Sequence, residues 1–247
     1  LPTSLLDAGA DLVVQSWHKT LPVLTQGSAL LVNAQYKGIS PEPFLSLLQT
    51  TSPSYLLMAS LEAGSLYMGQ QAQTHIDQSL PLIFALHDKI NRTLSTLQVL
   101  WNPQWQQDPF KLYLLSDKLS GAEMDAYLRE HHAIYSEMHD NNGILFILPL
   151  QTTAQWTERL YHALQSLDDF AKQQERAVTP APSFYCRQIP QQQYPLHEAF
   201  YMEKEQIPWH NAADRTAGQF ILRYPPGIPL LVPGEIITRE IVQLWIA

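Results

Sequence analysis

Residues 111–173 alternate twice between a short apolar segment and a longer amphipathic one, and this alternation restricts the fold more than any other feature of the chain. The apolar segments are KLYLL at 111–115 and NGILFILPL at 142–150, and the second is apolar enough to be a buried central strand. A helix is predicted after each, over 121–131 and 153–173. The second helix has one apolar face, made of Trp156, Leu160, Ala163, Leu164, Leu167 and Phe170. The block predicts a small α/β domain.

The segments on either side of this block are less regular. Before it, strands are predicted at 10–14 and 29–33, a short helix opening with prolines at 41–50, and a turn at 51–55. The stretch from Tyr55 to Leu100 is mostly compatible with a helix, and its second part reads as a long connecting helix. After the block, residues 176–183 read as a Pro-rich linker, followed by irregular chain, a short strand and a final helix from about Pro233.

Composition excludes several classes of function. The 247 residues carry a formal net charge of −8 and no run of Lys or Arg, which argues against nucleic acid or an anionic membrane as the main partner. Cys186 is the single cysteine, so no disulfide can form within the chain, and a reducing, cytoplasmic setting is expected. No apolar run approaches the roughly 20 residues that span a bilayer.

The stretch VVQSWHKT, residues 13–20, places polar and reactive side chains at the end of what reads as a buried strand. A lysine becomes a Schiff-base nucleophile when it is held in a defined, partly desolvated position. A nearby serine hydroxyl and a histidine can hydrogen-bond a phosphate. Ser16, His18 and Lys19 therefore fit the aldehyde and the phosphate of pyridoxal phosphate. On spacing alone, a solvated lysine beside a loop histidine is the competing interpretation.

Four segments, in order, resemble the bacterial ornithine/lysine/arginine decarboxylase family, whose members have the aspartate-aminotransferase fold (fold type I). They are SWHKTLPVLTQGS at 16–28, TSPSYLLMASLEAG at 51–64, the small-domain block at 108–150, and YPPGIPLLVPGE at 224–235. The resemblance implies an α/β chain made of the C-terminal part of this fold with a C-terminal extension. It places a remnant of the cofactor-binding domain at 1–78, a connecting helix and the small domain at 79–178, and the extension at 179–247.

The same resemblance implies the function and the site. Lys19 would bind the cofactor as a Schiff base and act with His18 as a catalytic residue, while Ser16 and His18 would hold the phosphate. Thr51 and Ser52 would approach the phosphate bound by a neighbouring subunit, so a homodimer or higher oligomer with the site at its interface is expected. The implied reaction is decarboxylation of arginine, lysine or ornithine to an amine of the polyamine pathway, with no metal.

One part of the family pattern is absent. The phosphate turn, the ring-stacking residue and the aspartate that pairs with the pyridine nitrogen precede the lysine in the family, whereas eighteen residues precede Lys19 here. Asp7 and Asp11 are the acids among them, and Asp11 is too close along the strand to serve. The chain is therefore expected to be an incomplete, poorly active portion. An aminotransferase or aldolase of the same fold, or a non-catalytic regulatory relative, are the alternatives.

Other chemically capable residues have simpler interpretations. His131, His132 and His139 are expected to be solvated or capping rather than metal ligands, and Asp168 and Asp169 to lie on a solvated helix face. Glu235 could begin the last helix, which is favoured, or face a cationic substrate. Cys186 is expected to be a small buried hydrophobe. The aromatic residues of the tail could pack or line a substrate entrance: Phe184, Tyr185, Tyr194, Phe200, Tyr201 and Trp209.

Overall fold

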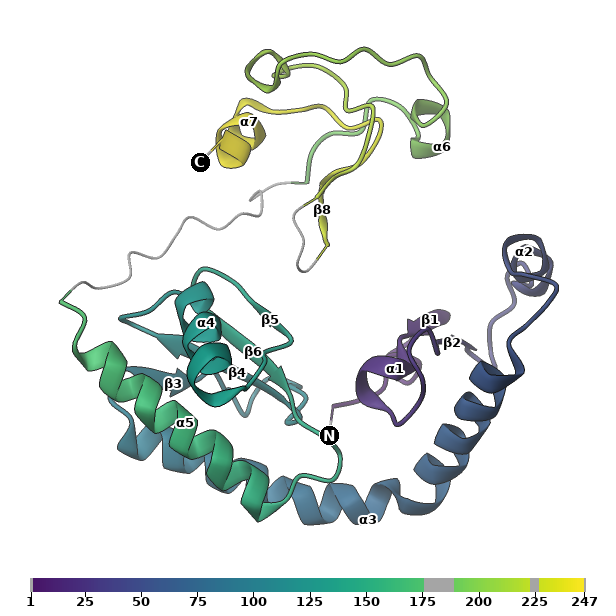
Figure 1. The fold of residues 1–247 in the computed structure, drawn as a ribbon. Coiled ribbons are helices and arrows are strands. Elements are labelled where there is room, and N and C mark those ends of the chain that lie inside the picture. The colour runs from purple at the N-terminus through teal and green to yellow at the C-terminus, as the bar shows by residue number, and fades with distance from the viewer. Residues whose placement is uncertain (1, 176–188, 223–226, 247) are drawn as a thin grey trace. The chain divides into compact units, whose positions relative to one another are not determined.

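The computed structural model describes residues 2–175, 189–222 and 227–246. The chain forms two compact units, Leu1–Val178 and Thr179–Ala247, each of which is described by itself (Figure 1). The predicted linker at 176–183 lies outside the described residues, as do Phe184, Tyr185 and Cys186. The boundary expected at 78/79 falls inside one continuous helix, and the three-part division stays a prediction.

The core of the first unit is a four-stranded antiparallel sheet. Its strands are β3 (Leu97–Val99), β4 (Lys111–Ser116), β5 (Met138–His139) and β6 (Gly143–Ile147), in the order β3-β4-β6-β5. The register pairs Leu112 with Phe146 and Leu114 with Ile144, so these four side chains share one face of the sheet. The apolar segment at 142–150 does form an internal strand, β6, which confirms that prediction.

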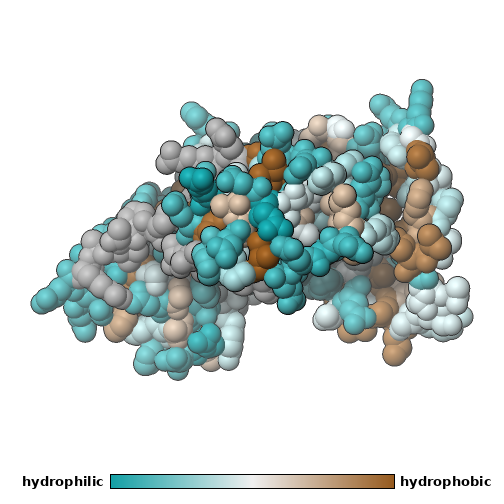
Figure 2. Space-filling view, turned by 90° about the horizontal axis from the view of Figure 1, so that it is seen from above, coloured by the Kyte–Doolittle hydropathy of each residue, from teal (hydrophilic) through white to brown (hydrophobic). Residues whose placement is uncertain are grey.

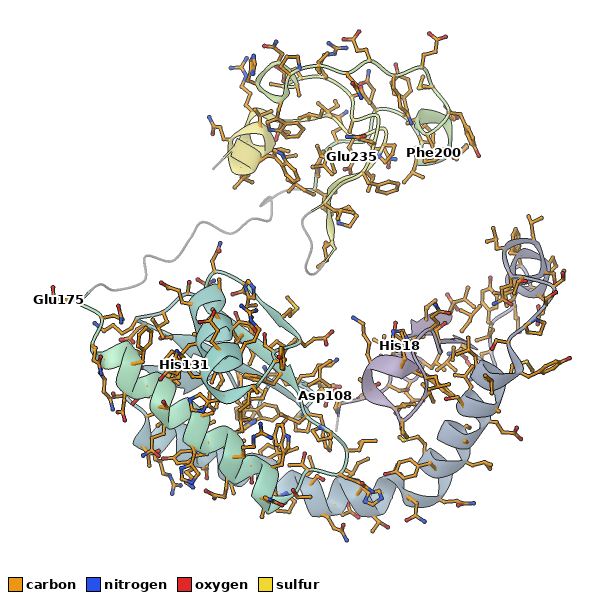
Figure 3. All side chains as sticks on the ribbon, viewed as in Figure 1. His18, Asp108, His131, Glu175, Phe200 and Glu235 are labelled. Carbon is orange, nitrogen blue, oxygen red and sulfur yellow. The ribbon has the colours of Figure 1, made fainter. Side chains whose placement is uncertain are left out.

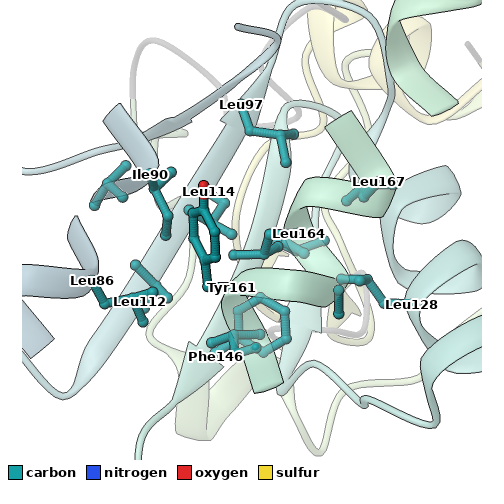
Figure 4. Packing of buried hydrophobic residues seen from close by; sticks show 14 of the residues in the cluster. Leu86, Ile90, Leu97, Leu112, Leu114, Leu128, Phe146, Tyr161, Leu164 and Leu167 are labelled. Carbon is teal, nitrogen blue, oxygen red and sulfur yellow. The ribbon is translucent and has the colours of Figure 1, made fainter. Parts of the chain in front are cut away.

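Three helices supply the other half of this core. They are α4 (Gly121–His132), α5 (Ala154–Lys172) and the second half of α3 (Tyr55–Thr93). Figure 4 shows Leu86 and Ile90 of α3 and Tyr161, Leu164 and Leu167 of α5 packed with the sheet residues. The predicted apolar face of α5 is confirmed. Ser120 begins α4 with a capping box. Its hydroxyl accepts from the backbone N–H of Glu123, and the Glu123 carboxylate accepts from the backbone N–H of Ser120.

The end of α3 corrects two predictions. The helix was expected to continue to Leu100, but it ends at Thr93 and Leu97 begins β3. Asp168 explains the break, because its carboxylate accepts hydrogen bonds from the backbone N–H groups of Ser95 (3.0 Å) and Thr96 (2.7 Å). Asp168 is only 1% exposed, so the expectation of a solvated face was wrong for it. It shares a helix face with the buried Leu164 and Ala171, three or four residues away.

The N-terminal segment packs much less tightly. It contains β1 (Leu12–Gln15), which pairs antiparallel with β2 (Ala29–Val32), and the short helices α1 (Trp17–Thr20) and α2 (Glu42–Leu48). The prediction of a buried strand before Ser16 was wrong: Val13 is buried, but Val14 is 77% exposed. Residues 2–66 also carry many other exposed large apolar side chains: Leu5, Leu12, Leu24, Val32, Ile39, Phe44, Leu47, Leu48, Tyr55, Leu56, Met58 and Leu66. Figure 2 shows hydrophobic residues, in brown, on the visible face of the molecule.

The second unit is small and contains mostly irregular backbone. Its elements are α6 (Leu196–Ala199), a 3-10 turn (Trp209–Asn211), β7 (Ile221–Leu222), β8 (Pro229–Leu231) and α7 (Arg239–Ile246). Leu231, Ile237, Ile241 and Val242 are in its core, and Trp209 packs against them and donates its indole N–H to the carbonyl of Val242 at 3.1 Å.

The final helix begins later than expected, and this corrects the interpretation of Glu235. The Thr238 hydroxyl accepts from the N–H of Ile241 at the start of α7, so Glu235 is not in the first turn. Its carboxylate instead accepts from the N–H of Val232 at 2.8 Å and closes the turn through Gly234, whose φ is +96°. Glu235 and Phe200 are labelled in Figure 3; Phe200 and Tyr201 are exposed, whereas Tyr194 is half-buried.

Candidate functional site

Ser16, His18 and Lys19 lie on one tight turn that follows β1. Ser16 precedes α1, whose single turn is closed by the N–H of Lys19 donating to the carbonyl of Ser16 at 3.2 Å. The N–H of Leu21 donates to the carbonyl of Trp17 at 2.7 Å. Since these bonds are local, the short sequence itself places Ser16, His18 and Lys19 on one turn, while their roles stay a prediction.

This turn is fixed against the first half of α3. The N–H of Leu24 donates to the hydroxyl of Ser60 at 2.8 Å. Gly64 of α3 allows close packing, because a Cβ there would lie 2.3 Å from the Cγ1 atom of Val23. The helix therefore sets the position of the turn that carries Lys19.

The imidazole of His18 is held by a backbone carbonyl. Its Nδ1 atom lies 2.8 Å from the carbonyl oxygen of Gly27, and the N–H of His18 donates to the same oxygen at 3.1 Å. His18 is half-buried, and no hydrogen-bond partner for its Nε2 atom lies among the described residues. The ring orientation is thus set, while one nitrogen is available to a ligand.

The amine of Lys19 contacts a residue that sequence reasoning missed. Its Nζ atom lies 3.2 Å from Oε1 of Glu137, which precedes β5 and is 118 positions further along the chain. The Lys19 and Glu137 side chains are 52% and 36% exposed, so the pair contributes at most about 1 kcal/mol. No local pattern around Glu137 signals this contact. Lys19 is in a defined position, although it is more solvated than its chemistry led us to expect.

A cavity of about 370 Å³ lies beside Lys19. Its other walls are Pro22, Tyr67 of α3, and residues 147–151 at and beyond the end of β6. A smaller cavity of about 160 Å³ shares Leu21 and Leu148 with it and extends to Asp108. Figure 3 shows His18 on α1 and Asp108 at the neighbouring end of the sheet. The larger cavity has the size of a small-molecule site, with apolar walls and few polar groups.

Polar side chains border the same cavity. The ring of Tyr67 stacks on that of His75, with centroids 5.6 Å apart, and Nε2 of Gln151 lies 2.9 Å from Nε2 of His75. Because Gln151 donates through its amide, this His75 nitrogen is the acceptor. Tyr67 and Gln151 are therefore held in place where they line the cavity.

Two of the expected phosphate ligands, Thr51 and Ser52, do not lie on this turn. Ser16 does lie on it, where its side chain is exposed and makes no capping bond. Thr51 and Ser52 are exposed in the bend before α3, and neither forms a hydrogen bond to Ser16, His18 or Lys19 within the part of the chain that the structure describes. A single chain does not bring all the expected ligands together, and their roles stay predictions.

The three candidate metal-binding histidines are separated. His131 and His132 end α4 and lie against the ring of Tyr127, with centroids 4.5 and 5.9 Å away, while His139 is in β5 (His131 is labelled in Figure 3). Across residues 2–175, 189–222 and 227–246, no group of three or more His, Cys, Asp or Glu side chains is arranged to hold a metal ion. The described helices also include none that is long and apolar enough to cross a membrane.

The residues on the turn fit two ends of pyridoxal phosphate. Lys19 presents an amine at the cavity wall, and Ser16 and His18 present a hydroxyl and a ring nitrogen on the same turn. The carboxylate of Asp7 accepts a hydrogen bond from the hydroxyl of Ser4 at 2.7 Å, and no hydrogen bond or ion pair joins it to Ser16, His18 or Lys19 among the described residues. The turn thus carries groups that could hold the aldehyde and the phosphate, and within the part of the chain that the structure describes no carboxylate on this turn could pair with the pyridine nitrogen.

Two family models match the chain. The model described as the Orn/Lys/Arg decarboxylase major domain matches residues 2–118, and the model of the C-terminal domain of the same family matches residues 164–245. Among curated proteins, the arginine decarboxylase of Halalkalibacterium halodurans is 35% identical and that of Bacillus subtilis 33% identical. Each alignment covers 97% of this chain and 50% of the relative, so the chain spans about half the length of the curated relatives it matches.

Solved structures show the same fold. The lysine decarboxylase of Francisella novicida superposes with a TM-score of 0.76 at 22% identity, covering 94% of this chain and 44% of that one. The constitutive lysine decarboxylase of Escherichia coli gives 0.71 at 18% identity, covering 95% and 45%. These likenesses confirm the fold class that the sequence predicts.

Proposed function

The chain belongs to the Orn/Lys/Arg decarboxylase family, and from that premise we propose that it forms the lysine-bearing portion of an enzyme that decarboxylates a basic amino acid with pyridoxal phosphate. The observation that supports this most directly is the Lys19 amine, which is fixed on the α1 turn at the wall of the 370 Å³ cavity. Arginine is the favoured substrate, because the curated relatives at 32–35% identity are named arginine decarboxylases. The product would be an amine of the polyamine pathway.

Each residue of the turn has a part in this proposal. Lys19 binds the aldehyde of the cofactor, and Ser16 and His18 bind its phosphate. Thr51 and Ser52 approach the phosphate held by a neighbouring subunit, so the complete site lies at a subunit interface. When bound, the cofactor supplies the electron sink that decarboxylation needs. The cavity walls exclude water and orient the substrate beside it.

Replacing Lys19 with alanine is expected to abolish covalent capture of the cofactor. Wild-type chain mixed with pyridoxal phosphate should develop the visible absorption band of a lysine-bound cofactor, and borohydride reduction should fix the label on Lys19, as read by mass spectrometry of the digest. Lys111→Ala is the matched control, since Lys111 lines the adjoining cavity. An equally strong band in Lys19→Ala, or a label distributed over other lysines, would refute the proposal.

Replacing Glu137 with glutamine should speed cofactor capture. The ion pair holds the Lys19 nitrogen against the Glu137 carboxylate, and this nitrogen must leave the contact before it can attack an aldehyde. Because the pair is half-exposed, the gain is at most about fivefold, the equivalent of 1 kcal/mol. Stopped-flow absorbance at fixed pH measures it, and added salt should produce part of the same gain in wild-type chain. Glu130→Gln, an exposed change on α4, should leave the rate unaltered.

A further inference from the structure

The orientation of His18 determines which of its ring nitrogens carries hydrogen. A carbonyl oxygen only accepts hydrogen bonds, so the Nδ1 atom that lies 2.8 Å from the Gly27 carbonyl must be the donor. The neutral ring then has its hydrogen on Nδ1, and Nε2 bears a lone pair. The second hydrogen bond to the same carbonyl, from the N–H of His18 itself, keeps the ring beside this oxygen.

This tautomer is unsuited to bind a phosphate dianion. The oxygens of the dianion accept hydrogen bonds and donate none. The Nε2 atom without hydrogen is likewise only an acceptor. Two acceptors facing one another give no hydrogen bond. A proton must join the pair before Nε2 can donate to the anion, whereas the hydroxyl of Ser16 donates without any change of charge.

We propose that His18 binds the cofactor phosphate only as the doubly protonated imidazolium, so that filling the phosphate position of the α1 turn takes up one proton at Nε2 of His18. This inference rests on the proposed function for the identity of the phosphate. The same proton uptake is expected for any oxyanion that only accepts hydrogen bonds and binds at this position. Because one proton is taken up, the binding step is coupled to pH, and the affinity for the anion falls by at most about tenfold for each unit by which the pH is raised.

The charges around His18 allow this protonation to be driven by the anion. Lys19 is the neighbouring charged group on α1, and its ammonium is paired with Glu137. The residues that contact the turn from α3 are uncharged: Ser60, Leu61 and Gly64. Among the described residues, no carboxylate forms a hydrogen bond or ion pair with His18. The arriving anion is therefore the negative charge that stabilises the imidazolium.

Nuclear magnetic resonance of the ring nitrogens tests this inference with inorganic sulfate as the probe. Sulfate is an acceptor-only dianion that does not itself titrate near neutral pH. Long-range nitrogen–proton spectra of the free wild-type chain, recorded at a pH where the ring is neutral, should show hydrogen on Nδ1 and a bare Nε2 for His18. Sulfate should convert His18 to the doubly protonated form, while the exposed His197 stays unchanged. The apparent sulfate affinity should decrease as the pH is raised.

His18→Gln provides the matched variant, because a glutamine amide donates a hydrogen bond without titrating. Its sulfate affinity should be independent of pH over the same range. Three results would overturn the inference: a neutral His18 with its hydrogen on Nε2, an anion bound while Nε2 stays bare, or a His18 spectrum that does not respond to sulfate.

The same samples separate this inference from the proposed function. The Lys111→Ala chain, the control of the cofactor experiment, retains His18 and Lys19 and should respond to sulfate as wild type does. A normal sulfate response combined with no lysine-bound cofactor in the wild-type chain would reject the proposed function and leave the proton uptake standing.

Discussion

Replacing Asp168 with alanine is expected to lower the free energy of unfolding of the residue 1–178 unit by about 3 kcal/mol. The carboxylate accepts from the N–H groups of Ser95 and Thr96 and from the hydroxyl of Thr96, and it pairs with the ammonium of Lys172 at 2.8 Å. Burial disfavours the charged form, but the bonds from Lys172, Thr96 and Ser95 outweigh it and hold the pKa of Asp168 below its usual value. Alanine would leave the N–H and the hydroxyl of the buried Thr96 without an acceptor.

Asp169→Ala is the control for this prediction. Asp169 pairs with the same Lys172 at 2.9 Å, but its side chain is 66% exposed, so its loss should cost less than about 0.5 kcal/mol. Urea unfolding followed by far-UV circular dichroism compares the two variants at neutral pH. Equal losses of stability would show that Asp168 acts only through Lys172 and does not hold the chain between α3 and β3.

Acidification from pH 7 to pH 4 should cost the same unit about 3 kcal/mol through a single side chain, His87 of α3. His87 is 4% exposed, and among the described residues neither ring nitrogen has a hydrogen-bond partner. The rings of Phe84 and Trp101 surround it, with centroids 5.9 and 5.6 Å away. Burial lowers the pKa of His87 to about 4, against a smaller opposing effect of Asp88.

The sign of this effect follows from the two pKa values. The pKa of His87 is about 4 in the folded chain and about 6.5 in the unfolded chain, so the unfolded state binds a proton first as the pH falls. The stability that the neutral ring provides is therefore complete above pH 6.5 and is lost between about pH 6.5 and pH 4.

His87→Leu isolates this contribution. The variant should be close to wild type in stability at pH 7.5, because an apolar side chain removes two buried polar atoms that have no partner. Its unfolding free energy should decrease less on acidification, by about 3 kcal/mol at pH 4. His162→Gln, on the exposed face of α5, should follow wild type throughout. Parallel pH curves for wild type and His87→Leu would contradict the prediction.

The elements that the sequence predicted well are those with a strong internal period. The apolar face of α5 and the continuous apolar run of β6 can each be recognised from a short stretch of sequence. Both elements contribute to the core. The end of α3 is different. Leu94 and Leu97 continue the helical spacing from Ile90, and the helix ends because Asp168, 73 positions after Ser95, takes up the next N–H groups. No local pattern contains that information.

The candidate site likewise has a part that the sequence predicts and a part that it does not. Ser16, His18 and Lys19 are neighbours in sequence, so the short stretch itself shows that they share a turn. Glu137 approaches Lys19 only because the sheet is folded, and no spacing rule connects positions 118 residues apart. The exposure of Val14 was not predictable either, because an apolar strand indicates burial without indicating what covers it.

The proline inside α3 has a mechanical consequence for the site. Pro81 removes one hydrogen bond of the helix, and helices bend at such points. After Pro81, the side chains of Ile83, Leu86 and Ile90 are buried in the core of the small domain. Before it, Ser60 holds the Lys19 turn about 30 Å along the axis, so a change of about 5° in bend moves that turn by about 3 Å. The first half of α3 thus pivots at Pro81 and carries the Lys19 turn with it. The distance between Lys19 and Glu137 therefore depends on a bend angle of the helix that is remote from both residues.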